Sequence, residues 1–287
     1  MSNKGLVSII IANYNNSRYI QSTLDSVILQ TYKQIQIIIV DDGSTDDSIS
    51  IISNFIQCNK ESFWIDSLLL RTNIGSGFAK SKGLELVKGE FCCFLDSDDW
   101  LPEHSIMTVV DALEDNPHLA MIYTNAFKID AFGNTIGLLN YARDGSDLLN
   151  DRVCFHLAIW RMTYYNELQN KFDGNYYIAY DIDLYMKIEE IGDILFINEP
   201  LYYYRVHSNN ISIGYDRLGH SYVERIITRW EAQKRRGEID TRILGKELQQ
   251  LLYKKTEKKQ KTFTIAKFFK KLKSYIRLQV LKLMNEL

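Results

Sequence analysis

The stretch FCCFLDSDD, residues 91–99, joins an apolar run to a cluster of three carboxylates. Its first five residues are continuously apolar, as in a strand that is buried on both faces of a sheet. Asp96, Asp98 and Asp99 follow at once, and like charges so close together raise one another's pKa unless a cation lies between them. The stretch therefore predicts a buried strand that ends at a cation-binding site.

The segments around this stretch alternate between two kinds of pattern through about the first 130 residues. Strands are expected at residues 6–12, 35–40, 64–70, 91–95 and 119–127, where apolar residues dominate. Helices are expected over residues 20–28, from a capping box at Ser44 and Asp47 to residue 56, over residues 75–87, and from Pro102 onward. Helices that alternate with apolar strands indicate an α/β fold whose mostly parallel sheet is covered on both faces.

Three polar motifs come directly at the ends of expected strands: ANYNNS from residue 12, DDGSTD from residue 41 and DSDD from residue 96. The carboxyl ends of parallel strands meet at one edge of a sheet, where such folds bind ligands. The sequence has no G-x-G-x-x-G after the first strand and no Walker A motif, so a backbone phosphate cradle is not expected. The carboxylates favour a divalent metal, Mg²⁺ or Mn²⁺, that binds diphosphate oxygens.

Bulk composition excludes several classes of protein. The formal net charge of −2 over 287 residues gives no overall sign of a nucleic-acid-binding protein. The four cysteines have neither metal-site nor disulfide-framework spacing, and the adjacent Cys92 and Cys93 are expected to be small core residues. The sequence shows no signal peptide and no apolar run long enough to cross a bilayer. A cytoplasmic protein is therefore expected.

The C-terminal part differs from the rest in charge. From residue 254 onward there are eleven Lys or Arg residues against two Glu residues. On a helix, one apolar stripe forms opposite most of these charges; it consists of Ile265, Phe268, Phe269, Leu272, Ile276, Val280, Leu283 and Leu287. Such a helix can lie on an anionic membrane surface, and the alternative is that the stripe packs against the body of the protein or another subunit.

Four motifs carry a family resemblance: VSIIIANYNNSRYIQSTLDSVILQTY, IIIVDDGSTDDS, NIGSGFAKSKGLELVKGEFCCFLDSDDWLPE and YDIDLYMKI. In order and spacing they resemble the inverting family 2 glycosyltransferases of the GT-A fold, over about residues 5–215. The resemblance implies a Rossmann-like nucleotide-sugar-binding domain, a divalent metal, and sugar transfer with inversion at the anomeric carbon. We therefore expect a catalytic domain at residues 1–215 and a helical extension at residues 216–287.

The same resemblance implies roles for residues at the strand ends. Ala12 and Tyr14 match positions that line the pocket of the nucleotide base, and Asp42 matches an aspartate that hydrogen-bonds the pyrimidine ring. Because a carboxylate accepts the imide N–H of uracil, which cytosine lacks, Asp42 favours a UDP-sugar or dTDP-sugar. Asp98 matches a metal ligand, and Asp96 a residue near the ribose or the metal. The simpler alternative for Asp41 and Asp42 is that they cap the following helix.

Further roles follow from the second half of the chain. Asp181 matches the catalytic base, although Tyr180 stands where members commonly carry Glu, and the alternative for Asp181 is a helix cap. Lys80 stands where many members have an Arg that contacts the donor, and it keeps the charge without the planar fork. Two positions in YYYRVHSNNIS complete the set: Arg205 is expected to contact phosphate and His207 to bind the metal, with a surface histidine as the alternative.

The expected function is metal-dependent transfer of a sugar from a UDP-sugar to a saccharide acceptor. The resemblance and the basic tail imply an acceptor on a polyprenyl lipid, in O-antigen or capsule synthesis at the inner face of the cell membrane. No nucleic-acid partner is expected, and an oligomer stays possible. The alternatives are a sugar-phosphate nucleotidylyltransferase, which needs a Gly-rich loop with Arg that is missing here, and a non-catalytic nucleotide-sugar-binding protein.

Overall fold

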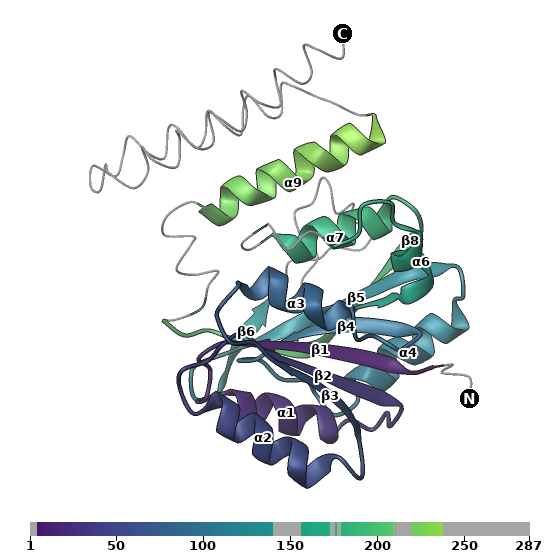
Figure 1. Cartoon of the computed structure of the whole chain (residues 1–287). Coiled ribbons are helices and arrows are strands. Elements are labelled where there is room, and N and C mark those ends of the chain that lie inside the picture. Colours follow the sequence, from purple (N-terminus) through teal and green to yellow (C-terminus); the bar gives the residue numbers. More distant parts are fainter. Residues whose placement is uncertain are drawn as a thin grey trace, which may run out of the picture. The chain divides into compact units, whose positions relative to one another are not determined.

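The computed structural model describes residues 5–139, 156–172, 176, 179–208, 210 and 220–237 (Figure 1). These residues lie in one compact unit, Met1–Ile239. The second unit, Asp240–Leu287, lies outside them, and so does the predicted basic amphipathic helix. None of the helices in the described ranges combines the length and apolar character that crossing a bilayer requires.

One eight-stranded sheet forms the centre of the unit. Its strands are β1 (Val7–Asn13), β2 (Ile35–Asp41), β3 (Trp64–Leu69), β4 (Phe91–Asp96), β5 (Leu119–Ile129), β6 (Thr135–Leu139), β7 (Ala158–Arg161) and β8 (Asp193–Arg205). They lie in the order β3-β2-β1-β4-β7-β5-β6, and β8 pairs with β5. Strands β1 to β4 are mutually parallel, whereas β7 runs antiparallel between β4 and β5. The predicted α/β fold with a mostly parallel sheet is confirmed.

Helices cover both faces of this sheet, as the alternating pattern predicts. They are α1 (Ile20–Ile28), α2 (Ser48–Asn59), α3 (Ser76–Leu84), α4 (Ser105–Asp115), α6 (Met162–Glu167), α7 (Tyr180–Glu189) and α9 (His220–Arg236). Figure 1 shows α1 and α2 on one side of the sheet and α3 and α7 on the other. The close packing of α3 on β1 requires a glycine, because a Cβ atom at Gly83 would lie 2.5 Å from Cγ2 of Ile10.

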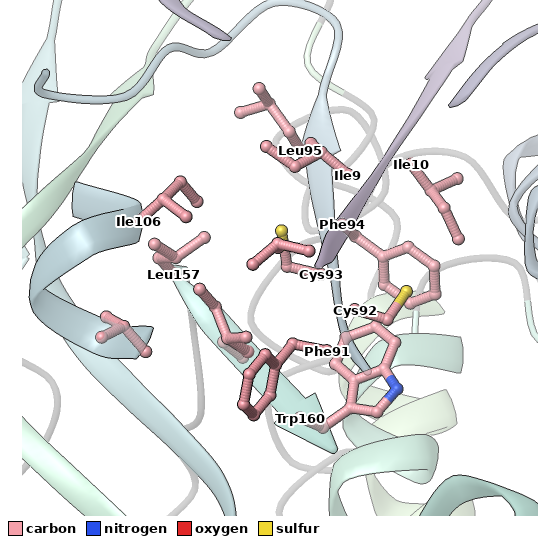
Figure 2. Close-up of a cluster of buried hydrophobic side chains, with 14 of the residues drawn as sticks. Ile9, Ile10, Phe91, Cys92, Cys93, Phe94, Leu95, Ile106, Leu157 and Trp160 are labelled. Carbon is pink, nitrogen blue, oxygen red and sulfur yellow. The ribbon is translucent and has the colours of Figure 1, made fainter. Parts of the chain in front are cut away.

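The core is organised around β4, the strand that FCCFL forms. Successive side chains point to opposite faces of the sheet, so Cys93 lies toward Ile106 of α4 while Phe94 lies on the other side (Figure 2). The ring of Phe94 packs edge-on against Trp160, with 5.0 Å between ring centroids. Trp160 is fully buried, so it is a core residue. The expected core roles of Cys92 and Cys93 are confirmed.

Two predicted helix starts are wrong. The first is the capping box, because α2 begins at Ser48, whose N–H is accepted by the Asp46 carboxylate at 3.0 Å. Capping requires the side-chain oxygen of Ser44 to accept a backbone N–H of the helix, but this oxygen accepts the N–H of Asn15 at 2.9 Å instead. The second is the start of α4 at Pro102. The helix begins at Ser105, whose N–H donates to the carbonyl of Pro102 at 3.1 Å.

The strands β6 and β7 are not predicted by the sequence pattern. Strand β7 has only four residues, too few for a periodic signal, and pairing with both β4 and β5 stabilises it. Its last residue, Arg161, is buried and donates to the Glu90 carboxylate at 3.0 Å and to the carbonyl of Leu119 at 3.1 Å. Tertiary pairing therefore decides the conformation of this segment.

Helix α9 falls in the stretch that the sequence assigns to the C-terminal extension. In the structure it packs against α7 and lies in the same compact unit as the sheet. The contact includes ion pairs from Arg235 to Glu190 at 2.8 Å and from Arg236 to Glu189 at 2.7 Å. The expected division of the chain after residue 215 stays a prediction.

Two leucines on α1 give a test of the core. Leu24 is fully buried, whereas Leu29 at the end of the helix is 57% exposed. We expect Leu24→Ala to lower the free energy of unfolding by about 2–5 kcal/mol, because it removes buried methyl groups and leaves a cavity. Leu29→Ala is expected to change it by less than about 0.5 kcal/mol. Urea denaturation measures both, and equal effects would contradict the packing of α1.

Candidate functional site

The polar motifs meet at one edge of the sheet, at the carboxyl ends of β2, β1 and β4. In the strand register Asn13 lies beside Asp41, and Ala12 lies beside Asp96. Asp42 directly follows β2. The sequence prediction that these motifs form one site is thus consistent with the topology.

Asp41 organises the loop around it. Its carboxylate accepts hydrogen bonds from Nδ2 of Asn13 at 2.8 Å and from the backbone N–H and the hydroxyl of Ser44 at 2.9 and 2.7 Å. All three residues are buried. Asp41 therefore fixes the two loops that follow β1 and β2 relative to each other, a role that the sequence pattern alone does not reveal for Asn13.

Asp42 lies against the start of α3. Its two carboxylate oxygens accept the backbone N–H groups of Ile74 and Gly75 at 2.7 and 2.8 Å. Burial raises the pKa of Asp42 above its usual value, although these two hydrogen bonds lower it. Each carboxylate oxygen has a second lone pair, so the predicted contact with a pyrimidine ring stays compatible with this arrangement. Of the other predicted pocket residues, Tyr14 is 47% exposed and Ala12 is partly buried.

Lys80 and Asp96 form an ion pair at the end of β4. Lys80 Nζ of α3 donates to Oδ1 of Asp96 at 2.7 Å, and the lysine side chain is almost completely buried. Burial opposes the charge of Lys80, but the Asp96 carboxylate raises its pKa above the usual lysine value. Nζ also donates to the hydroxyl of Tyr180 at 3.3 Å and lies over its ring. Lys80 and Tyr180, which both depart from the family pattern, are thus in contact.

His156 is a second basic group beside Asp96, and the sequence analysis does not identify it. Its Nε2 atom lies 3.8 Å from Oδ2 of Asp96, and its ring stacks on Tyr202 at 4.6 Å between centroids. Burial raises the pKa of Asp96, but Lys80 and His156 lower it more, so the carboxylate titrates below its usual range. Asp96 is therefore held ionised between two bases, Lys80 of α3 and His156, which lies two residues before β7.

Asp98 pairs with His207, the other residue for which the sequence predicts metal binding. Nε2 of His207 lies 2.8 Å from Oδ2 of Asp98, and the imidazole packs against Tyr19 with 4.9 Å between ring centroids. The pair joins residues more than a hundred positions apart in the chain. Because His207 faces a carboxylate and is buried, the alternative of a solvent-exposed surface histidine is wrong.

Asp99 and Arg205 hold the acidic turn in place. Asp99 is buried and accepts the hydroxyl of Tyr202 at 2.8 Å and the backbone N–H of Arg205 at 2.7 Å. Burial and the neighbouring carboxylates raise the pKa of Asp99 well above its usual value. The Arg205 guanidinium donates to the carbonyl of Asp98 at 2.6 Å and packs between the rings of Tyr19 and Trp100.

These partners of Arg205 differ from the expected one, which is a phosphate. The side chain is 2% exposed, and its guanidinium donates hydrogen bonds to backbone carbonyls. A contact between Arg205 and a phosphate stays a prediction, whereas its role in fixing the acidic turn follows directly from the geometry.

Asp181 lies in the first turn of α7. Its Oδ1 accepts the N–H of Ile182 at 2.8 Å. Burial raises the pKa of Asp181 above its usual value, and the nearby Lys80 and His156 oppose this rise. Asp181 is therefore electrostatically coupled to the same bases that flank Asp96, so the two carboxylates belong to one cluster.

Asp183, two residues further on, faces another direction. It forms a buried ion pair with Lys187 at 2.6 Å and lies 3.7 Å from the guanidinium of Arg235. These contacts tie α7 to α9 and support the interpretation of Asp183 as a structural residue.

The residues present fit a divalent cation in part. Two adjacent ligand atoms of an octahedral ion with bonds of about 2.1 Å lie roughly 3 Å apart. The distance from Oδ2 of Asp98 to Nε2 of His207, 2.8 Å, is close to this value. A carboxylate with an imidazole suits Mn²⁺ better than Mg²⁺, which prefers oxygen ligands alone. Within the described ranges no group of three His, Cys, Asp or Glu side chains is arranged for a metal.

Solved structures with a similar fold bind nucleotide sugars. The Staphylococcus aureus TarS fragment 1–349 in complex with UDP-GlcNAc superposes with a TM-score of 0.60 at 22% identity, covering 71% of this chain and 60% of that one. The mannosyltransferase PcManGT of Pyrobaculum calidifontis, in complex with GDP-Man and Mn²⁺, has a TM-score of 0.60 at 18% identity, covering 77% and 63%. At these identities the likeness shows a shared fold.

Sequence comparison shows the family. The chondroitin synthase of Escherichia coli is 32% identical over 212 residues, which are 72% of this chain and 30% of that protein. The chain thus spans about a third of that relative's length. The sequence profile described as "Glycosyl transferase family 2" matches residues 8–186, which is more than half of the chain. The chain belongs to glycosyltransferase family 2, the family that its four motifs resemble.

Proposed function

We propose that this protein transfers a sugar from a nucleoside diphosphate sugar to a hydroxyl group of a saccharide acceptor, with inversion at the anomeric carbon. The observation that carries the proposal is the cluster at the end of β4. There, Lys80 and Asp96 lie within electrostatic reach of Asp181, and Asp98, paired with His207, lies on the same turn as Asp96. This cluster combines a cation site for a leaving diphosphate with a carboxylate that can act as a base.

Each residue of the cluster has a part in the reaction. Asp181 accepts the proton of the acceptor hydroxyl as its oxygen forms a bond to the anomeric carbon. The bond from that carbon to the diphosphate oxygen breaks, and its electron pair leaves with the nucleoside diphosphate. Lys80 and His156 keep Asp96 ionised and lower the pKa of Asp181.

Asp98 and His207 are the residues that would hold the metal. When bound, Mn²⁺ or Mg²⁺ supplies positive charge that stabilises the leaving diphosphate. Asp99, Tyr202 and Arg205 hold the turn that presents Asp98, so they act by positioning.

The donor is proposed to be a UDP-sugar, with the base in the pocket of Ala12, Tyr14 and Asp42. The structure of TarS with UDP-GlcNAc supports a uridine donor for a related fold. The similarity to a chondroitin synthase supports a setting in bacterial polysaccharide synthesis. We further propose an acceptor on a polyprenyl lipid and attachment of the basic tail to an anionic membrane surface, at the inner face of the cell membrane.

The two alternative functions predict different products. A nucleotidylyltransferase releases pyrophosphate from UTP and a sugar phosphate, and a non-catalytic protein binds UDP-sugars without turnover. A panel of labelled UDP-sugars, assayed for release of UDP and of free or transferred sugar, separates them from the proposed transferase. Release of UDP from at least one UDP-sugar is expected, whereas pyrophosphate formation in a parallel assay with UTP and sugar phosphates would identify the nucleotidylyltransferase.

Metal dependence tests the Asp98 site. We expect chelation to abolish turnover and Mn²⁺ to restore it, because Asp98 and His207 need the cation to hold the diphosphate. Asp98→Asn should weaken the binding of UDP in the presence of Mn²⁺, as measured by calorimetry. Asp111→Asn, an exposed change on α4, serves as the control and should bind UDP normally. Full turnover in metal-free buffer would refute the assignment.

A second substitution tests the base. Asp181→Asn keeps the size of the side chain but cannot accept a proton, so turnover should fall by about 10²–10⁴-fold while UDP still binds. The neighbouring Asp183→Asn should instead lower the melting temperature, because it removes the partner of Lys187 in a buried ion pair. If Asp181→Asn stays within a few-fold of the wild-type rate, another group is the base.

The pH dependence of turnover gives a third test. Burial raises the pKa of Asp181, and the base works only when ionised, so the fall of turnover with falling pH should have its midpoint above the usual aspartate value of 3.8. The positive charge of Lys80 lowers this pKa, so Lys80→Met should move the acidic limb of the rate profile to higher pH. Rate profiles at saturating Mn²⁺ measure the shift, and a shift to lower pH would contradict the coupling.

A further inference from the structure

We propose that Phe132 and Arg18 form a binding site for a pyranose ring of the acceptor saccharide, at the rim of the Asp98 site. The inference rests on the proposed transferase function and adds to it the residues that receive the acceptor. It comes from an exposed aromatic side chain on a rigid turn that is joined to the acidic turn after β4.

Phe132 is unusually exposed for an aromatic residue. Its side chain is 83% exposed, more than any other large apolar side chain in the part of the chain that the structure describes. Two apolar side chains of β6 in the same hairpin, Ile136 and Leu138, are 54% and 50% exposed. An exposed apolar surface of this kind near a catalytic site indicates a binding surface.

The turn that carries Phe132 is held by its own hydrogen bonds. Asp130 Oδ1 accepts the N–H groups of Phe132 and Asn134 at 2.8 and 2.9 Å, and Oδ2 accepts Nδ2 of Asn134 at 3.0 Å. Gly133 has φ +95°, and a Cβ atom there would lie 2.5 Å from the Trp100 ring. The backbone position of Phe132 is thus fixed before a ligand binds. Less conformational entropy of the turn is then lost on binding.

The turn is also joined to the catalytic side of the sheet. The guanidinium of Arg205 donates to the carbonyl of Asp98 at 2.6 Å and to the carbonyls of Asp130 and Ala131 at 3.4 and 3.3 Å. One buried cation therefore connects the backbone of the metal-binding turn to the backbone of the Phe132 turn. The two turns keep a fixed relation to each other.

Arg18 continues the same surface toward His207. Its Cζ atom lies 5.8 Å from the centre of the Phe132 ring and 5.3 Å from that of Tyr19, and the Tyr19 ring packs on His207. Arg18 is exposed, and it forms no ion pair with any residue that the structure describes. Its guanidinium is thus available to hydroxyl or carboxylate groups of a ligand.

The order of the strands favours the acceptor over the nucleotide as the occupant. The predicted base pocket lies at β1 and β2, whereas the Phe132 turn joins β5 and β6, on the other side of β4 in the sheet. A diphosphate at Asp98 lies between them in this order. The apolar face of a pyranose ring suits an aromatic ring, and its hydroxyl or carboxylate groups suit an adjacent guanidinium.

Ligand-observed NMR with two probes, methyl β-D-glucuronide and methyl β-D-glucoside, tests the site on the full chain with UDP and Mn²⁺ present. Wild-type protein is expected to show saturation transfer to at least one glycoside. Phe132→Ala should weaken this binding by about tenfold, the factor that corresponds to loss of one aromatic contact, and Phe132→Tyr should retain it. Arg18→Ala should weaken the glucuronide more than the glucoside if the guanidinium pairs with the carboxylate.

Trp64→Ala is the matched control, because Trp64 is a 45% exposed aromatic at the start of the edge strand β3, away from the carboxyl ends. It should leave glycoside binding unchanged. Binding of neither glycoside to the wild type, or equal binding to wild type and Phe132→Ala, would overturn the inference. Release of UDP from UDP-sugars by the wild type without added glycoside reports the proposed function separately, so the failure of one is distinguishable from the failure of the other.

Discussion

Mutual repulsion among the carboxylates at the end of β4 is the constraint on which the surrounding architecture depends. Each acid has its own compensating partner. Asp96 pairs with Lys80 of α3, Asp98 faces His207 after β8, and Asp99 receives the hydroxyl of Tyr202 from within β8. Helix α3 and strand β8 therefore converge on one turn, and the sheet brings together segments that lie far apart in the sequence. The fold and the charge distribution of the site are two aspects of one arrangement.

The sequence predicts those parts of the fold that carry a local signal. The strands β1, β2 and β4 are continuous apolar runs because both faces of the parallel sheet are buried, and such runs are visible without knowledge of their partners. Strand β7 has no such signal, since its four residues adopt an extended form only between β4 and β5. The capping box fails for a related reason: the side-chain oxygen of Ser44 accepts hydrogen bonds from Asn13 and Asn15, and this competition is decided in three dimensions.

The same distinction applies to the site. Asp96, Asp98 and Asp181 are predicted because they stand in short motifs with a fixed spacing. His156 and Tyr202 are not, because each meets the acids only through the topology of the sheet. Lys80 and Tyr180 both depart from the family pattern and lie a hundred positions apart in the sequence, yet their side chains are in contact. The two departures therefore change the surroundings of Asp96 together. Arg205 has the expected location but unexpected partners, since its guanidinium binds backbone carbonyls.

This preference of Arg205 for carbonyl oxygens has an evolutionary consequence. Every residue has a carbonyl, so the attachment of the β5–β6 turn to the acidic turn does not depend on which side chains the β5–β6 turn carries. Residues at its tip, such as Ala131 and Phe132, are free to diversify while the catalytic geometry is conserved. Gly133 cannot be replaced in the same way, because a Cβ atom there would collide with the Trp100 ring. A scaffold with this arrangement is able to acquire new substrates through mutations in one exposed turn, without loss of the chemistry that it performs.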